Sequence, residues 1–464
     1  MTQDKKEEIY FIGLGGAGMS ALAELLLDWG YGVSGSDRQE SAVLERLRKR
    51  GATVYIGHDA AQLSSARLLV YSSAVPGDNP ELRAARRAGI PCVKRAQLLG
   101  QLMVGHRGIA VAGTHGKTTT TSMIAHVLKS CGLDPTAVVG GTMSDTGRGA
   151  ISGRGSYFVT EADEYDRSFL TLFPQIGVIT NLEADHLDIY KDMDDLIDTF
   201  GAFVKHIPLT GKVIYNGEDE HAIRAVRGAY ARTLSFGLRE GADIHAGHIS
   251  ESDGGSRAHI TYRGKFLGML TMNLPGLHNI KNALATIAVA LECGLSFAEI
   301  STALETFSGV ERRFQFKGKV DDCLFYDDYA HHPTEVRAAL EAARRGWSRR
   351  IVVLFQPHLY SRTRDFYREF AEALDVADRV LLAPVYPARE KPLPGVSSEM
   401  IAARLQKPHV LIDDNEAIAE TLCRECRRGD LVLAMGAGDI WKYQMEAMAL
   451  LKENDCAGGG HARN

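Results

Sequence analysis

The chain has few cysteines, no long hydrophobic run and no block of basic residues. Its 464 residues include seven cysteines that are mostly scattered, so we expect no disulfide framework and a reducing compartment. The one close pair, Cys423 and Cys426, has neither a second pair nor a nearby histidine to complete a zinc site. The sequence contains no stretch of about 18 uncharged apolar residues and no apolar leader. We therefore expect a cytoplasmic protein that does not enter the membrane.

The charge balance also limits the class of partner. Lysine and arginine total 53 and aspartate and glutamate total 58, which gives a net charge of −5. Without a basic patch, nucleic acid and anionic membranes are not expected as partners. A local phosphate site needs only a few donors and stays open. Glycine is abundant, with 47 residues, and it gathers in short loops of the kind that bind phosphates.

The first glycine-rich loop has the sequence GLGGAG at residues 13–18. It lies between an apolar strand at residues 9–12 and an apolar helix at residues 19–29, and Asp37 ends the next strand. This spacing is typical of a dinucleotide-binding turn, whose literal interpretation is NAD(P) binding. The diphosphate of another nucleotide, such as a UDP-sugar, could bind to the same glycine turn and helix N-terminus. Close packing of strand on helix is a third explanation.

The most informative segment is GTHGKTTT at residues 113–120. A strand, a glycine loop, a Lys-Thr pair and a helix place backbone N–H groups around phosphate oxygens. Lys117 would reach the β- and γ-phosphates, and the Thr118 hydroxyl would bind Mg²⁺. The loop is two residues shorter than the common GxxxxGK[ST] pattern. A loop without a ligand would need neither the lysine nor the run of threonines.

Two later loops carry acidic residues after predicted strands. Glu161 follows a strand at residues 156–160, and His186 lies in a loop after residues 177–180. Groups at the carboxyl ends of parallel strands converge on the ligand crevice. A carboxylate such as Glu161 suits Mg²⁺, whereas an imidazole is an unusual ligand for it. Taken alone, each of these residues is an ordinary loop residue, and only the nearby phosphate loop favours a metal site.

Strand and helix patterns alternate along the whole chain. We predict an α/β fold of three domains: a Rossmann-like domain at residues 1–105, a central P-loop ATPase-type domain at 106–312, and a Rossmann-like domain at 313–464. Residues 240–275 alternate more and carry glycine turns, which predicts hairpins beside the central domain. The polar tail from about residue 452 is expected to be disordered.

Three later segments add polar side chains at strand ends and helix starts. Asn279 could read an adenine edge, although helix capping explains an asparagine equally well. The adjacent histidines 331 and 332 follow a strand, and because neighbouring side chains diverge we favour substrate and nucleotide contacts over a metal pair. Arg362 lies in a polar loop and suits a carboxylate or a phosphate, although a solvated helix start fits it as well.

Taken in order, these segments resemble the Mur ligases of peptidoglycan synthesis. The resemblance covers nearly the whole chain, and the shortened phosphate loop looks like the form this family uses. The motifs that carry it are GLGGAGMS (13–20), SGSD (34–37), SSAV (72–75), AGTHGKTTTT (112–121), EADEYDRSF (161–169), TNLEADHLD (180–188), LPGLHNIKNALA (274–285), ERRFQ (311–315), YDDYAHHPTEV (326–336), FQPHLYSRTRD (355–365) and MGAGDI (435–440).

The resemblance implies an ATP-dependent ligase that joins L-alanine to the lactyl carboxylate of UDP-N-acetylmuramate, with Mg²⁺ or alternatively Mn²⁺. It implies UDP-sugar binding by the first domain, ATP binding by the second and amino-acid binding by the third, in a monomer or weak homodimer. By similarity, Lys117, Glu161 and His186 are catalytic, and Thr118, Glu161 and His186 hold the metal. The implied ATP contacts are Gly113, Thr114, His115, Gly116, Lys117, Thr118, Thr119, Asn279 and Asp328. The implied substrate contacts are Gly15, Gly16, Gly18, Ser20, Asp37, Ser73, Arg313, Tyr329, His331, His358 and Arg362.

Two departures separate this sequence from patterns of the family. Leu359 stands where an arginine is usual, although Arg362 and Arg364 remain nearby. Residues 198–202 lack the lysine that several sibling ligases place after the DH motif, as expected for the alanine-adding member. The open alternatives are a family member that adds a tripeptide or another amino acid, a nicotinamide-dependent oxidoreductase suggested by the first loop, and a non-catalytic nucleotide-binding scaffold.

Overall fold

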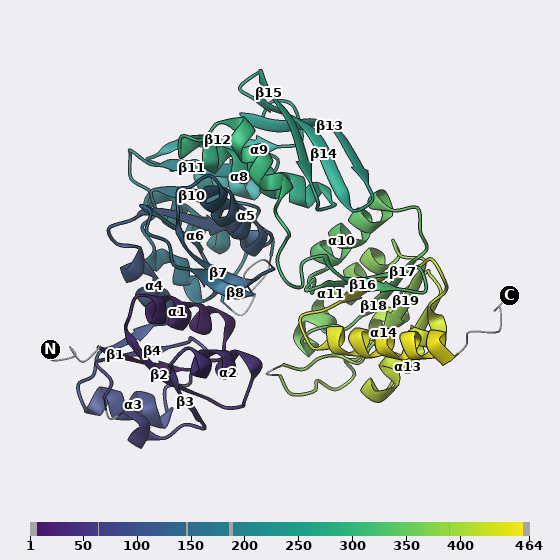
Figure 1. Ribbon diagram of the computed structural model, residues 1–464, viewed down its shortest axis with the longest axis horizontal. Helices are drawn as coiled ribbons and strands as arrows, with labels where there is room; N and C mark the ends of the chain where they lie inside the picture. The colour runs from purple at the N-terminus through teal and green to yellow at the C-terminus, as the bar shows by residue number, and fades with distance from the viewer. Residues whose placement is uncertain (1–6, 64, 145–146, 185–188, 389, 458–464) are drawn as a thin grey trace. The chain divides into compact units, whose positions relative to one another are not determined.

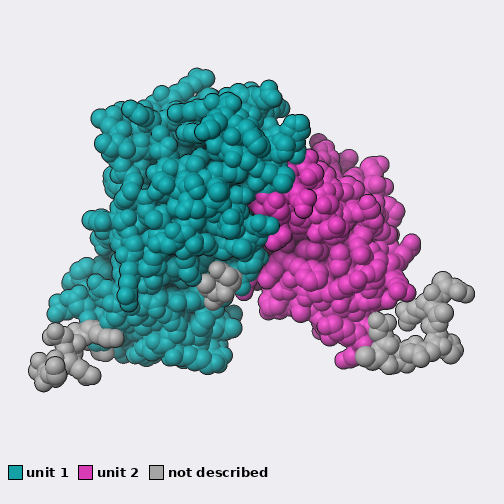
Figure 2. Space-filling view, turned by 45° about the horizontal axis from the view of Figure 1, so that its top comes forward, with its two compact units in different colours: residues 1–248, 258–270, 281–310 teal, residues 249–257, 271–280, 311–464 magenta. Residues whose placement is uncertain are grey.

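The computed structural model describes residues 7–63, 65–144, 147–184, 189–388 and 390–457. The chain divides into two compact units (Figure 2). Unit 1 comprises residues 1–248, 258–270 and 281–310, and unit 2 comprises residues 249–257, 271–280 and 311–464. The three-domain α/β class is confirmed, since three separate sheets follow one another along the chain (Figure 1).

The first sheet is parallel, with the strand order β3-β2-β1-β4-β5. Its strand order reverses at β1, so the loop after β1 lies at the switch point where ligands bind in such sheets. The strands are β1 (Glu8–Ile12), β2 (Gly32–Asp37), β3 (Thr53–Ile56), β4 (Leu68–Tyr71) and β5 (Cys92–Lys94). The helices are α1 (Ala17–Asp28), α2 (Ala42–Lys49), η1 (Ala60–Leu63), α3 (Pro80–Arg87) and α4 (Arg95–Met103).

The second sheet has ten strands in the order β15-β14-β13-β12-β11-β10-β6-β9-β7-β8. Its strands are β6 (Arg107–Ala112), β7 (Thr136–Met143), β8 (Arg148–Ile151), β9 (Tyr157–Glu161), β10 (Ile176–Ile179), β11 (Lys212–Asn216), β12 (Arg232–Gly237), β13 (Ile244–Ser252), β14 (Gly255–Tyr262) and β15 (Lys265–Met272). Its helices are α5 (Lys117–Ser130), η2 (Tyr165–Thr171), α6 (Met193–Lys205), α7 (Glu220–Val226), α8 (Leu277–Glu292) and α9 (Phe297–Glu305). Two-residue turns with positive φ, at residues 253–254 and 263–264, join β13 to β15 as the predicted hairpins.

The third sheet has six strands in the order β16-β17-β21-β18-β19-β20. Its strands are β16 (Gln315–Val320), β17 (Cys323–Asp328), β18 (Ile351–Phe355), β19 (Arg379–Leu382), β20 (His409–Leu411) and β21 (Leu431–Met435). Its helices are α10 (Pro333–Gly346), α11 (Tyr360–Leu374), α12 (Glu399–Ala402), η3 (Asn415–Ala417), α13 (Ile418–Glu425) and α14 (Ile440–Ala457).

Helices cover both faces of this third sheet. Every residue of β18 is buried, because alternate side chains pack against α10 and α11 on one face and against α13 and α14 on the other. The tail prediction was wrong at its start, because α14 continues to Ala457. Residues 458–464 lie outside the described part of the chain.

Among the described residues, no helix is both long enough and apolar enough to cross a membrane. The free thiols are Cys92, Cys131, Cys293, Cys323, Cys423 and Cys426. Burial raises the pKa of Cys426 strongly and raises that of Cys423 as well, which disfavours the reactive thiolate.

Candidate active site

The first glycine loop joins β1 to α1 and is held by the end of β2. The Gly15 N–H donates to Asp37 Oδ2 at 2.8 Å, so this carboxylate fixes the loop as well as ending the strand. Gly16 caps α1 without a side-chain hydrogen bond. Ser20 is buried and donates its hydroxyl to the Ala17 carbonyl at 3.0 Å. The N-terminus of α1 therefore faces a loop of glycines, as a diphosphate site requires.

The second glycine loop, residues 113–117, adopts a conformation that depends on glycine. Gly113 has φ +134° and Gly116 has φ +81°. A Cβ on Gly113 would lie 2.0 Å from Thr180 Oγ1, and one on Gly116 would lie 2.7 Å from Asn282 Oδ1. The N–H groups of Thr114 and His115 are bound to Asn181, each at 2.9 Å. The loop is thus fixed by the strand end of β10 before any ligand arrives.

Lys117 begins α5 and folds back over this loop. Its ammonium donates to the Gly113 carbonyl at 2.5 Å, the Thr114 carbonyl at 3.2 Å and Glu164 Oε2 at 2.8 Å. Burial alone would lower the pKa of Lys117, but Glu164 and the other nearby carboxylates outweigh it and raise the pKa. The lysine is therefore charged, and its charge lies at the centre of the loop.

Two oxygen donors lie together beside the loop. Glu161 ends β9, its Oε1 accepts the Gly140 N–H at 2.6 Å, and its carboxylate is hydrogen-bonded to the Thr118 side chain. Burial raises the pKa of Glu161, opposed by the Gly140 N–H and by Lys117. A buried carboxylate beside a hydroxyl offers the hard oxygen ligands that Mg²⁺ prefers, so these residues fit the predicted metal. The predicted third ligand, His186, lies outside the described residues.

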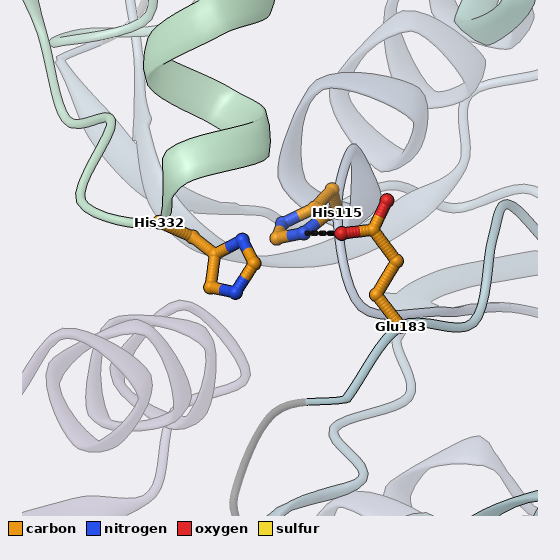
Figure 3. Close-up of side chains that lie close together, drawn as sticks. All are labelled: His115, Glu183 and His332. Atoms are coloured by element: carbon orange, nitrogen blue, oxygen red, sulfur yellow. Dashed lines mark hydrogen bonds and ion pairs between the residues drawn. The ribbon is translucent and has the colours of Figure 1, made fainter. Parts of the chain in front are cut away.

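His115 points to the loop after β10. Its Nε2 lies 3.3 Å from Glu183 Oε2 (Figure 3), and Thr114 Oγ1 accepts the Glu183 N–H at 2.9 Å. Thr119 is buried in the first turn of α5. Ser73, predicted as a substrate contact, is exposed and donates to Asp166 Oδ2 at 2.8 Å.

The remaining predicted residues lie in unit 2. The guanidinium of Arg313 lies over the Tyr329 ring, 5.3 Å from its centroid, and Tyr329 contacts His331 edge-on. His331 is 5.9 Å from His358 between ring centroids, and His358 neighbours Arg362. Unit 2 thus brings these five residues into one row of aromatic and cationic side chains.

Asp328 and Asn279 are also in unit 2. The Asp328 carboxylate accepts the Phe314 N–H and the Ala330 N–H, each at 2.7 Å. Burial raises its pKa to about 6, opposed by Arg313 and by these two N–H groups. Asn279 is buried at the start of α8 and donates to the Pro275 carbonyl at 2.7 Å. This bond is local, because Pro275 lies two residues before the start of α8.

A glutamine in place of His278 should weaken the dependence of unit 2 stability on pH. Burial, with Arg345 and Arg313 nearby, lowers the pKa of His278 from 6.5 to about 4. The unfolded chain takes up the proton below pH 6.5 and the folded chain does not, so stability falls as the pH falls toward 4. The loss for this half-buried group is at most about 2 kcal/mol at pH 5.

Melting temperatures measured at pH 7.5 and at pH 5 test whether His278 contributes to the pH dependence of stability. The drop between the two values should be smaller in His278→Gln than in the natural protein. The matched control is His409→Gln, at an exposed position in β20, which should keep the natural drop. Equal drops in all three proteins would show that His278 does not titrate as its surroundings indicate.

Sequence reasoning missed several residues that shape the site. Glu164 pairs with Lys117, Asn181 holds the phosphate loop, and Arg95 lies against the first glycine loop. Glu164 and Asn181 follow β9 and β10 in segments already marked as polar strand ends. The sequence therefore indicated that these polar segments belong to the site, but it did not single out Glu164 or Asn181 within them. For Arg95 the sequence carries no comparable signal.

Fold and site together define an α/β protein with two glycine-rich loops at strand-to-helix turns, the second one with a lysine and with the side-chain oxygens of Glu161 and Thr118 beside it. Three family profiles match the chain: the "Mur ligase family, catalytic domain" at residues 8–107, the "Mur ligase middle domain" at 111–290, and the "Mur ligase, glutamate ligase domain" at 312–438. The chain belongs to the Mur ligase family, and the predicted resemblance is confirmed.

Individual relatives cover nearly the full length. The UDP-N-acetylmuramate–L-alanine ligase of Geotalea uraniireducens (strain Rf4) is 46% identical over 455 residues, which are 97% of this chain and 99% of that protein. The crystal structure of the UDP-N-acetylmuramate–alanine ligase of Thermotoga maritima matches with a TM-score of 0.82 and 31% identity, over 96% of this chain and 99% of that one. A murein peptide ligase of Psychrobacter arcticus 273-4 matches with a TM-score of 0.71 and 25% identity, over 98% of this chain and all of that one.

Proposed function

We propose that the protein is an ATP-dependent ligase that joins L-alanine to the lactyl carboxylate of UDP-N-acetylmuramate and releases ADP and phosphate. This reaction is a step in the synthesis of peptidoglycan precursors. The relative at 46% identity carries this activity in its name. The observation that carries the chemistry is the pairing of Glu161 with Thr118 beside the lysine of the phosphate loop.

Within this proposal the second glycine loop binds the phosphates of ATP. Residues 113–119 offer their backbone N–H groups and the Lys117 ammonium, while Thr118 and Glu161 hold Mg²⁺, with Mn²⁺ as an alternative ion. His186 stays a predicted third ligand. When bound, the metal ion neutralises charge on the phosphate oxygens. Asn279 and Asp328 are the proposed contacts of the nucleoside.

The chemistry follows from the poor reactivity of a carboxylate toward an amine. A lactyl carboxylate oxygen attacks the γ-phosphorus of ATP, the bond to the bridging oxygen breaks, ADP departs, and an acyl phosphate forms. The neutral amine of L-alanine then attacks the acyl carbon, phosphate leaves, and the amine loses a proton. Lys117 stabilises the charge on the transferring phosphoryl group. Acyl phosphates react with water, so the site has to exclude it.

The other two substrates are assigned to the remaining groups of residues. The first glycine loop, with Gly15, Gly16, Gly18, Ser20 and Asp37, is the proposed site of the UDP part, and Ser73 is a further predicted contact. The row formed by Arg313, Tyr329, His331, His358 and Arg362 is proposed to bind the alanine and muramoyl end. Its arginines suit the alanine carboxylate. Leu359, which stands where the family usually has an arginine, adds no charge to this row.

A ligase that adds a preformed tripeptide is the nearest rival. The alanine-adding ligase of known structure matches with the higher identity and TM-score of the two, 31% and 0.82 against 25% and 0.71, which favours the alanine-adding activity. An oxidoreductase would leave Lys117 and its loop without a role. The monomeric or weakly dimeric state and the cytoplasmic location stay predictions.

Release of phosphate from ATP tests the proposal. Release should require both UDP-N-acetylmuramate and an amino acid, and L-alanine should give the highest kcat/KM among L-alanine, glycine, L-serine and the tripeptide. A preference for the tripeptide would move the protein to the rival activity. Phosphate release without the UDP-sugar, or a change in NADH absorbance, would contradict the ligase assignment.

A further inference from the structure

One acidic loop pairs with a cation at each of the two glycine-rich loops. Glu164 pairs with Lys117 of the second loop, with Nζ to Oε2 at 2.8 Å. The preceding residue, Asp163, pairs with Arg95, with Nη2 to Oδ2 at 3.2 Å. Glu164 is buried, whereas the side chains of Asp163 and Arg95 are 41% and 26% exposed. The Asp163–Arg95 pair is therefore the more exposed of the two.

Arg95 begins α4 and lies directly against the first glycine loop. A Cβ on Gly18 would lie 3.0 Å from Arg95 Nη1 and 3.1 Å from its Cδ. The absence of a side chain at Gly18 thus leaves the room that the guanidinium occupies. The first turn of α1 contains no acidic residue, and the Asp37 carboxylate at the end of β2 accepts the Gly15 N–H of the preceding loop.

The acidic loop is held rigidly, which fixes the direction of Asp163. Asp163 Oδ1 accepts the Tyr165 N–H at 3.2 Å, and its carbonyl accepts the Ser168 hydroxyl at 2.8 Å. The next residues, Asp166 and Arg167, are both left-handed, with φ 55° and 53°. A backbone in this region persists only where its surroundings hold it. The guanidinium of Arg167 does so, bound to both oxygens of Asp195 at 2.8 and 2.7 Å.

We propose that Arg95 binds the diphosphate of the nucleotide sugar, held in position by Asp163 when the site is empty. The inference rests on the proposed function, which places a UDP-sugar at the first glycine loop. A planar guanidinium can donate two parallel hydrogen bonds to a phosphate. Arg95 then binds phosphate groups at the first glycine loop, as Lys117 does at the second. The counter-ions of these two cations are the adjacent residues Asp163 and Glu164 of the acidic loop.

Binding of UDP to the full-length protein, measured by calorimetry, tests this directly. Arg95→Ala should weaken UDP binding by at least about tenfold, the effect of losing one strong charge-assisted contact. Arg95→Lys should recover part of the loss. Uridine, followed by NMR titration, should bind both variants as it binds the natural protein. The KM for ATP should change by less than about twofold. The control is Arg83→Ala, an exposed arginine of α3, which should leave UDP binding unchanged.

Two outcomes would overturn the role of Arg95. Natural affinity of Arg95→Ala for UDP would show that the side chain does not contact the diphosphate. Equal losses for UDP and uridine, with a lowered melting temperature, would show that Arg95 only supports the fold. Both leave the proposed function standing, which fails separately if the natural protein releases no phosphate in the presence of UDP-N-acetylmuramate and L-alanine.

Discussion

Alanine in place of Lys117 should lower kcat for phosphate release by at least about 10³-fold, in line with the loss of a cation that stabilises a transferring phosphoryl group. The ammonium lies over its own loop, bound to the Gly113 and Thr114 carbonyls. Binding of UDP should survive, because the proposed UDP site is the other glycine loop. Steady-state kinetics and calorimetry with UDP measure the two effects on the same preparation.

Stability has to be controlled in this experiment. Removing the ammonium leaves Glu164, whose side chain is 2% exposed, as a buried carboxylate without its cation, which typically costs about 3–5 kcal/mol. The double variant Lys117→Met with Glu164→Gln removes both charges, and its melting temperature should lie closer to that of the natural protein. If this folded double variant released phosphate at a near-normal rate, the assignment of Lys117 would be wrong.

Alanine in place of Gly113 should destabilise the central domain by at least about 3 kcal/mol, because backbone strain and a steric clash add together. At φ +134° an L-residue is strained, and the added Cβ would lie 2.0 Å from Thr180 Oγ1 and 2.9 Å from the Asn181 carbonyl oxygen. Either the loop or the strand end has to move, and both belong to the proposed phosphate site. We expect a lower melting temperature together with loss of ATP-dependent phosphate release.

Gly132→Ala separates the two causes. Gly132 also has positive φ, +79°, but a Cβ there would meet nothing within 4 Å. This control should cost only about 1 kcal/mol and keep its activity. Equal destabilisation by the two substitutions, measured by urea unfolding, would show that crowding at Gly113 contributes nothing.

Elements with a strong local signal were predicted well. The second glycine loop has glycines where φ is positive and follows an apolar strand. Both features can be recognised from residues that are neighbours in the sequence. The predicted helix after this loop is α5, which begins at Lys117. The edge strands β16 and β20 contain almost no buried side chains, so their residues give little of the apolar signal that predicts a strand. The end of α14 was misjudged because composition marks a polar tail even where a helix continues.

Pairings between distant residues could not be predicted in the same way. Lys117 and Glu164 are 47 positions apart, and Arg95 and Asp163 are 68 apart. Their meeting depends on which strands neighbour each other, here β6 beside β9, and on the packing of α4. The sequence showed that the segment from Glu161 to Asp166 is acidic, but it did not show that Asp166 and Arg167 are left-handed.

Transfer of oxygen from the substrate tests the central claim most directly. UDP-N-acetylmuramate labelled with ¹⁸O in its lactyl carboxylate is converted with ATP and L-alanine, and the released phosphate is analysed by mass spectrometry. Activation through an acyl phosphate predicts one ¹⁸O atom in each phosphate formed, with the other retained in the new amide. Unlabelled phosphate, with the second ¹⁸O atom found in AMP or in water, would contradict phosphoryl transfer to the carboxylate.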